Sequence, residues 1–253
     1  MIRHILASGL FAGVAAGLLA TALQLVLVVP LIVEAERYES GEIAHFAAPP
    51  PAHEDTAAEA EHTHTHLHQH EHDADAGGGR LWGMPRSLGT LLSGIVSWSG
   101  FGLLLVAALA LANRAGIATG GMRGLAWGLA GFAALQFAPA LGLAPELPGS
   151  GAAPLVERQI WWLAAALATA AGLGLALIGQ GVALRLGGLV LIALPHLIGA
   201  PHPAAYAGVV PPELAALFAA RSLGVGAVGW AVLGLTAGYL LSRQPAAPRP
   251  APV

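Results

Sequence analysis

Long runs of apolar residues, separated by polar stretches, follow one another along the chain. A transmembrane α-helix needs about 20 predominantly apolar residues to cross the hydrocarbon core of a bilayer. The pattern therefore predicts an all-α fold, a polytopic integral membrane helix bundle of about six transmembrane helices. The six runs cover residues 5–33, 87–112, 124–143, 160–178, 184–200 and 214–241.

The fourth and fifth runs are separated by very few residues. Gly179, Gln180, Gly181 and Arg185 form the whole break. Such a break is typical of a tight hairpin between two helices, but it also fits one interrupted segment. Five transmembrane helices are therefore the alternative count.

One long polar segment, residues 37–86, interrupts the apolar pattern. It holds three consecutive prolines, an acidic run and three consecutive glycines. Because it has too few apolar residues to bury a core, we expect a disordered loop in the absence of metal. The predicted organisation is a first transmembrane helix with an outer mouth at 1–36, this loop, a bundle of about five helices at 87–243, and a Pro-rich tail at 244–253.

Charged residues divide between the two ends of the predicted bundle. If the amino terminus is cytoplasmic, every Asp and Glu falls on the outer side, while the arginines divide almost evenly. Acidic residues weigh little in the insertion rule, but complete segregation by alternate loops favours an even number of spans. We predict a protein of the inner (plasma) membrane with both termini cytoplasmic and the loop 37–86 extracytoplasmic.

The composition excludes several classes of function. The chain is 56% hydrophobic, and its net charge of −3 gives no clustered basic face for nucleic acid. It contains no lysine, so we expect no ATP site of the phosphate-loop type. Without cysteine there are no thiolate ligands, which disfavours Cu(I) as a cargo. The hydrolase motifs Gly-x-Ser-x-Gly and His-Glu-x-x-His do not occur, so we do not expect an enzyme.

Six histidines occupy alternate positions within the loop 37–86. Neutral imidazole is the commonest protein ligand of Zn, Ni, Co and Cu(II), and protons compete for it near about pH 6.5. A strand would put all six on one face and a helix would form two stripes, so both conformations chelate. A passive insert or an expression tag is the alternative, although tags are normally terminal. We predict metal capture by His62, His64, His66, His68, His70 and His72.

Three prolines, Pro30, Pro139 and Pro195, lie near the outer ends of predicted spans. Proline has no N–H, so each leaves the carbonyl four residues earlier without its usual helical donor. Such carbonyls can act as oxygen ligands, and Gln24 and Gln136 lie within about a turn and a half of the first two prolines. The alternative is that the prolines simply end helices. The carbonyls concerned belong to Val26, Leu135 and Leu191.

Ionisable residues at the outward ends of the first and fifth runs form a second candidate site. Both runs lead to the same membrane face, and imidazole with carboxylate suits Co, Ni or Zn. Ionisable groups at such positions are candidates for function, whereas the alternative for the histidine beside Pro195 is a hydrogen-bonded structural role. The predicted entry site beneath the His tract consists of Glu34, Glu36, His196 and His202.

Glycines at a spacing of four residues recur in three runs. In lipid, such faces let helix backbones approach closely. We expect these helices to pack on each other or on a second subunit. The glycines are Gly9, Gly13 and Gly17, then Gly120, Gly124 and Gly128, then Gly234 and Gly238.

Three stretches are distinctive when taken together. They read VVPLIVEAE at 28–36, FAPALG at 137–142 followed by RQIWW at 158–162, and LPHLIGAPHP at 194–203. With them, the sequence resembles the CbtA family of predicted cobalt transporter subunits over nearly the whole chain. The resemblance implies cobalt as the cargo and a small His-bearing membrane partner, CbtB. It also implies about five spans, one fewer than the apolar runs indicate.

The function favoured by these observations is a membrane subunit for uptake of a divalent transition metal. The residues alone predict only a divalent ion bound by His and carboxylate groups. Nickel and zinc are therefore alternatives to the cobalt that the resemblance implies. A membrane metal buffer or sensor that transports nothing is a further alternative. A membrane enzyme is the least supported. The expected partners are the lipid bilayer and a CbtB-like subunit.

Overall fold

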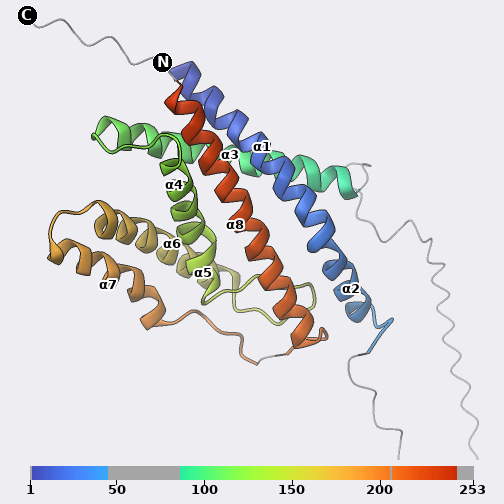
Figure 1. The fold of residues 1–253 in the computed structure, drawn as a ribbon. Helices are drawn as coiled ribbons and strands as arrows, with labels where there is room; N and C mark the ends of the chain where they lie inside the picture. The colour runs from blue at the N-terminus through green and yellow to red at the C-terminus, as the bar shows by residue number, and fades with distance from the viewer. Residues whose placement is uncertain (1, 45–85, 206, 244–253) are drawn as a thin grey trace, which may run out of the picture.

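The computed structural model describes residues 2–44, 86–205 and 207–243, and most of this part of the chain is helical (Figure 1). The all-α prediction is confirmed. The predicted His tract at 62–72 lies outside the described residues. The elements are α1 (Ile2–Leu27), α2 (Val29–Glu39), α3 (Arg86–Arg114), α4 (Arg123–Phe132), the π-helix η1 (Ala133–Phe137), α5 (Ala138–Ala140), α6 (Leu155–Ile178), α7 (Val182–Ile198) and α8 (Pro212–Ser242).

Each of the six apolar runs falls on helix, but the helices differ in length. Among the described residues, four are long and apolar enough to cross a membrane: Arg3–Leu27, Ser87–Arg114, Leu155–Ile178 and Pro212–Ser242. Helix α7 has 17 residues, or about 26 Å at 1.5 Å per residue, somewhat less than the hydrocarbon core. The third run folds as α4, η1 and α5 in direct succession. The structure thus supports a helical membrane protein with four candidate spans.

The prediction of one uninterrupted helix over residues 5–33 was wrong. The chain breaks at Val28, and α2 then continues to Glu39, three residues into the predicted loop. The cause is Pro30, which offers no N–H to the end of α1. The amides of Leu31 and Ile32 both donate to the Val28 carbonyl instead, at 3.0 and 3.3 Å.

The glycine faces pack against other helices of the same chain. In α1, a Cβ at Gly13 would lie 2.5 Å from the Ser99 Cα of α3. In α4, a Cβ at Gly124 would lie 2.8 Å from the Gly238 Cα of α8. Real Cβ atoms do not approach other atoms this closely, so both seams require glycine. Packing within the chain, the first of our two alternatives for these glycines, is therefore what the structure shows for α1 with α3 and for α4 with α8.

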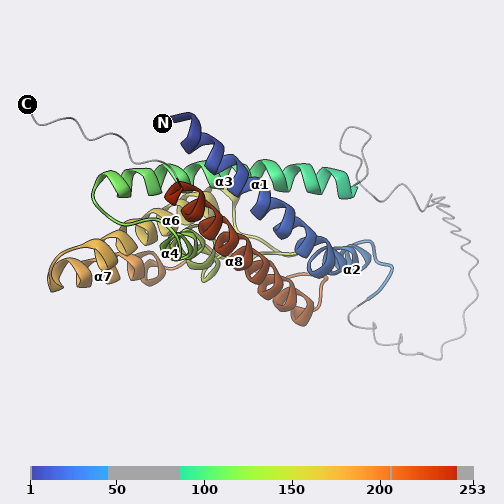
Figure 2. The same ribbon diagram turned by 45° about the horizontal axis from the view of Figure 1, so that its top comes forward.

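Helices α6 and α7 form an antiparallel hairpin, seen at the edge of the bundle in Figures 1 and 2. Gly181 has φ 98°, a conformation that favours glycine, and it begins the return of the chain. A Cβ at Gly188 would lie 2.5 Å from the Gly172 carbonyl oxygen, so the two helices touch through backbone. Among the described helices, α7 packs against α6, and α6 reaches the others through α4, η1 and α5. Runs four and five are therefore two helices.

The described parts of the segments predicted to lie outside gather at one end of the bundle. Ala35 of α2, Leu147 and Val210 form a small buried cluster there, and the loops before α6 and α8 are joined by a bridge between Ser150 and Gly208. At the opposite end, the amino-terminal part of α1 lies beside the carboxy-terminal part of α8 (Figures 1 and 2). All acidic residues of the described ranges lie on α2 or its following turn, in the loop before α6, or in the first turns of α6 and α8.

Candidate functional site

Three segments far apart in the sequence meet at the indole of Trp161 on α6. Its Nε1 donates a hydrogen bond of 3.2 Å to the Pro195 carbonyl of α7. Its ring stands edge-on to the His196 ring, with 5.7 Å between centroids. A Cβ at Gly142 would lie 2.8 Å from Trp161 Cζ2 and 2.8 Å from the Ala200 Cβ. Two of the three distinctive sequence stretches thus contribute residues to one contact region, the Trp161 cluster, defined as Gly142, Trp161, Pro195, His196 and Ala200.

His196 has a free ring nitrogen within this cluster. Its Nε2 atom is buried and has no hydrogen-bond partner in the described part of the protein. A buried polar group without a partner costs about 1–3 kcal/mol, and native proteins usually satisfy such groups. The edge-on contact with Trp161 fixes one side of the ring. An imidazole nitrogen without a hydrogen-bond partner can serve as a ligand of a metal ion.

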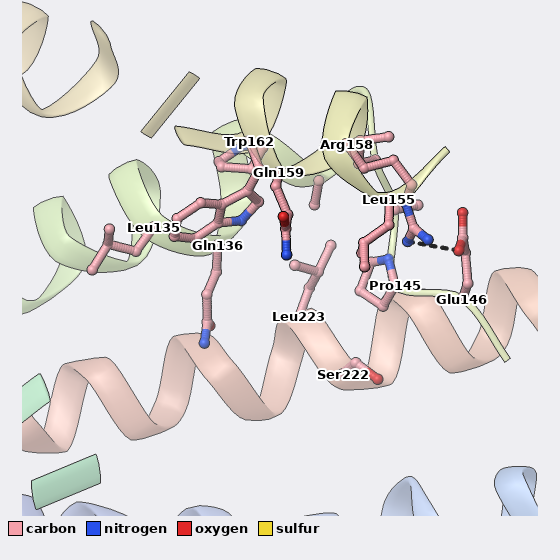
Figure 3. A pocket seen from close by; sticks show the side chains of 14 residues that line it. Leu135, Gln136, Pro145, Glu146, Leu155, Arg158, Gln159, Trp162, Ser222 and Leu223 are labelled. Carbon is pink, nitrogen blue, oxygen red and sulfur yellow. Dashed lines mark hydrogen bonds and ion pairs between the residues drawn. The ribbon is translucent and has the colours of Figure 1, made fainter. Parts of the chain in front are cut away.

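A cavity of about 520 Å³ adjoins the cluster, between α6 and α8 (Figure 3). Helices α6 and α8 do not pack against each other, and the space between them is bounded by the end of the third run and by the following loop. Trp162, next to Trp161, lines it, and Gln136 and Gln159 extend toward α8 in Figure 3. Its other lining residues are Leu135, Pro139, Ala140, Leu143, Ala144, Pro145, Glu146, Leu155, Arg158, Ser222 and Leu223.

The cavity owes part of its shape to the π-helix. Pro139 provides no amide hydrogen, and the helix widens to the π form over the five residues before Ala138, whose N–H donates to the Ala133 carbonyl. Gln136 lies on this widened turn, and its Oε1 occupies the place that a Cβ at Gly226 of α8 would take. π-Helical turns often occur at functional sites. The proline prediction at Pro139 therefore located a real irregularity of the helix.

The remaining predicted entry residues lie elsewhere. Glu34 and Glu36 are on α2, which does not pack against α7, and His202 lies in the loop that leads to α8. Glu36 and His202 each have an interaction partner. In the described ranges no three His, Asp or Glu side chains come together in a group that could hold a metal ion. The structure therefore does not gather Glu34, Glu36, His196 and His202 into one site, and their role as ligands stays a prediction.

Arg37 follows Glu34 by about one turn of α2. The Arg37 Nε donates to Glu42 Oε1 at 3.0 Å. This hydrogen bond, together with the charge of Glu42, raises the pKa of Arg37, and the charge of Glu34 acts in the same direction. A fixed positive charge therefore remains close to the carboxylate that we predicted as a metal ligand.

Two charged contacts at this end escaped the sequence reasoning. Arg158 Nη2 donates to Glu146 Oε2 at 2.8 Å across the mouth of the cavity. Arg221 Nη1 donates at 3.0 Å to the Leu27 carbonyl, at the end of α1 where the Pro30 break leaves the helical ladder. The available signal was the position of Arg221 inside a predicted span, because an arginine there is costly unless a partner is present.

Comparison with protein families gives the same conclusion as the distinctive stretches. The family described as "Probable cobalt transporter subunit (CbtA)" matches residues 2–242. The chain belongs to the CbtA family. Comparisons with curated proteins and with solved structures gave no match. The CbtA match covers every helix from α1 to α8, and with the apolar helices it supports an integral membrane subunit that acts in cobalt transport.

Proposed function

We propose that this CbtA subunit mediates uptake of divalent cobalt, captured by the histidines at 62–72 and passed to His196, with Glu34 as a separate ligand position on α2. The family description supports cobalt as the cargo and a subunit role. The observation that carries the site is the buried Nε2 of His196, which has no hydrogen-bond partner among the described residues. A metal ion would satisfy this atom, and imidazole is a common ligand of divalent cobalt.

The other ligands of this site must come from elsewhere, because the described residues offer no second and third His, Asp or Glu beside His196. We assign them to the His tract, to carbonyl oxygens or to a partner subunit. A small His-bearing membrane protein of the CbtB kind is the proposed partner. In that case the metal site is completed when the partner binds this chain, which agrees with the description of the family members as transporter subunits.

The proposed arrangement places the protein in the plasma membrane with six spans, both termini cytoplasmic and the His tract outside. Support comes from the acidic residues, which collect at one end of the bundle, and from the proximity of the amino-terminal end of α1 to the carboxy-terminal end of α8 (Figure 1). Helix α7 and the α4–η1–α5 segment are the two additional spans beyond the four long helices.

Radiolabelled cobalt uptake tests this function. Cells that express the chain together with its neighbouring genes should accumulate more cobalt than cells with empty vector, and His196→Ala should lower the maximal rate at every cobalt concentration. His4→Ala is the matched control, because His4 is exposed at the opposite end of the bundle. No gain over empty vector, with or without the neighbouring genes, would refute the proposal. Cobalt binding without flux in proteoliposomes would identify a buffer or sensor instead.

A further inference from the structure

We propose that the cavity between α6 and α8 binds the headgroup of a phospholipid that carries both a phosphate and a primary ammonium group, as phosphatidylethanolamine does. This site is separate from the proposed metal site and does not depend on cobalt transport. Its evidence is the charge pair at the mouth of the cavity, the apolar walls and the position of the cavity at the end of a membrane span.

The first argument is charge. Arg158 and Glu146 are joined at 2.8 Å, and their side chains remain 30% and 34% exposed. A guanidinium has five N–H donors and a carboxylate has about four acceptor positions, so one hydrogen bond leaves both groups with unused capacity. A positive and a negative group therefore stand side by side at the mouth (Figure 3). A zwitterion matches both, with its phosphate on Arg158 and its ammonium on Glu146.

The second argument is depth. Arg158 lies in the first turn of α6, whose apolar span begins at Leu155. Trp162 lines the cavity one turn further along the helix, and tryptophan is enriched at the level of lipid headgroups. The cavity is therefore expected at the membrane interface, where phospholipid headgroups are the most abundant charged molecules.

The third argument is the nature of the walls. Leu135, Leu143 and Leu223 face the cavity from three different elements, while Gln136, Gln159 and Ser222 supply uncharged hydrogen-bonding groups. A volume of about 520 Å³ is in the usual range for small-molecule sites. An occupant with a charged head and an apolar remainder fits this combination of polar groups and leucine side chains. In a phospholipid, the glycerol and the first methylene groups form the apolar remainder.

Other occupants fit less well. A bare divalent cation would meet the Arg158 charge, and the residues that line the cavity include no histidine. An anionic lipid would match Arg158 but place no cation against Glu146. A choline headgroup has the right charges but no N–H to donate to the carboxylate.

A lipid-binding series on the full-length wild-type protein tests the proposal. Purified protein in detergent is titrated with phosphatidylethanolamine, its N-methylated forms, phosphatidylcholine and phosphatidylglycerol, and bound lipid is counted by native mass spectrometry. We expect the primary ammonium lipid to bind about fivefold more tightly than phosphatidylcholine, equivalent to about 1 kcal/mol, with affinity falling at each methylation. Equal affinity across the series would overturn the proposal. Soluble phosphoethanolamine that competed as well as the lipid would overturn the lipid as the occupant.

Variants locate the effect in the cavity. Glu146→Gln should abolish the preference for a primary ammonium, and Arg158→Gln should weaken binding of all the phosphate headgroups. Glu157→Gln is the matched control, because Glu157 is the residue before Arg158 and does not line the cavity. A preference that survived Glu146→Gln would overturn the assignment. The lipid series on the wild-type protein does not depend on whether any variant folds. Because the lipid measurements are made without metal, a negative result for lipid binding is distinguishable from a failure of cobalt uptake.

Discussion

Gly142→Ala tests whether the Trp161 cluster holds His196 in place. The new Cβ would clash most closely with Trp161 Cη2 and would lie 2.8 Å from both Trp161 Cζ2 and the Ala200 Cβ, well inside the 3.4 Å at which ordinary van der Waals contact begins. The indole cannot move freely, because its Nε1 is hydrogen-bonded to the Pro195 carbonyl. Gly142 does not have a positive φ, so alanine adds a steric conflict without backbone strain.

The expected cost follows from the size of the conflict. Overpacking in a well-packed region typically destabilises by about 1–3 kcal/mol, and for a chain of this length each kcal/mol lowers the melting temperature by about 2–4 °C. We expect a loss of about 2–12 °C in detergent, measured by thermal unfolding with intrinsic tryptophan fluorescence. Because Trp161 is in contact with His196, we also expect a lower maximal rate of cobalt uptake at equal protein in the membrane.

Gly187→Ala on α7 is the control, since nothing lies within 4 Å of a Cβ at Gly187. It should leave uptake unchanged and slightly stabilise the helix. Trp161→Phe removes the Cζ2 atom, so Gly142→Ala should cost much less in that background, which a double-mutant cycle measures. The reasoning is refuted if Gly142→Ala melts and transports like wild type, or if its cost is the same with phenylalanine at 161.

Three further predictions concern the topology and the His-rich segment. The chain has no cysteine, so single introduced cysteines can be labelled selectively. Thr63→Cys should react with an impermeant maleimide in intact cells and Gln244→Cys should not. The reverse pattern would overturn the proposed orientation, with the loop 37–86 outside and both termini cytoplasmic. Deleting residues 54–75 should weaken uptake at low cobalt and leave the saturated rate nearly intact, because a capture segment raises local concentration; a complete loss at saturation would contradict this. A peptide of residues 54–75 should bind more than one equivalent of cobalt at about pH 7.5 and release most of it at about pH 5.5, because protonation removes imidazole ligands. If calorimetry shows no such pH dependence, the acidic residues rather than the histidines bind the metal.

The sequence was sufficient to predict an all-helical protein with apolar helices. Hydropathy located the helices, and the acidic residues indicated which loops share an end. The arrangement of the helices within the membrane plane could not be predicted, because an apolar run has the same pattern whether it faces lipid or another helix. Glu34 and His196 were both expected at the outer end of the bundle, yet α2 packs on α8 while α7 packs on α6 at the edge of the bundle. The pattern therefore could not show that their helices lie apart.

Local irregularities were predicted less well than helices. Pro30 and Pro139 marked two of them, a break at Val28 and a π-helix before Ala138, whereas α7 continues through Pro195 to Ile198. Proline removes one donor, and the neighbouring helices determine what replaces it. The Arg221 bond to the Leu27 carbonyl joins residues 194 positions apart, a separation over which a single sequence carries no pairing information.

The pairing of α4 with α8 has a consequence for biosynthesis. Gly124 and Gly128 are covered by the backbone of α8 at Gly234 and Gly238, which the ribosome adds after the whole α6–α7 hairpin. At about 5–20 residues per second, translation of the roughly 110 residues between Gly124 and Gly238 takes on the order of 10 s. During that interval the glycine face of α4 lies open to lipid or to a membrane chaperone. A chain that stops before α8 should therefore be a target for membrane proteases, although its first five apolar runs are complete.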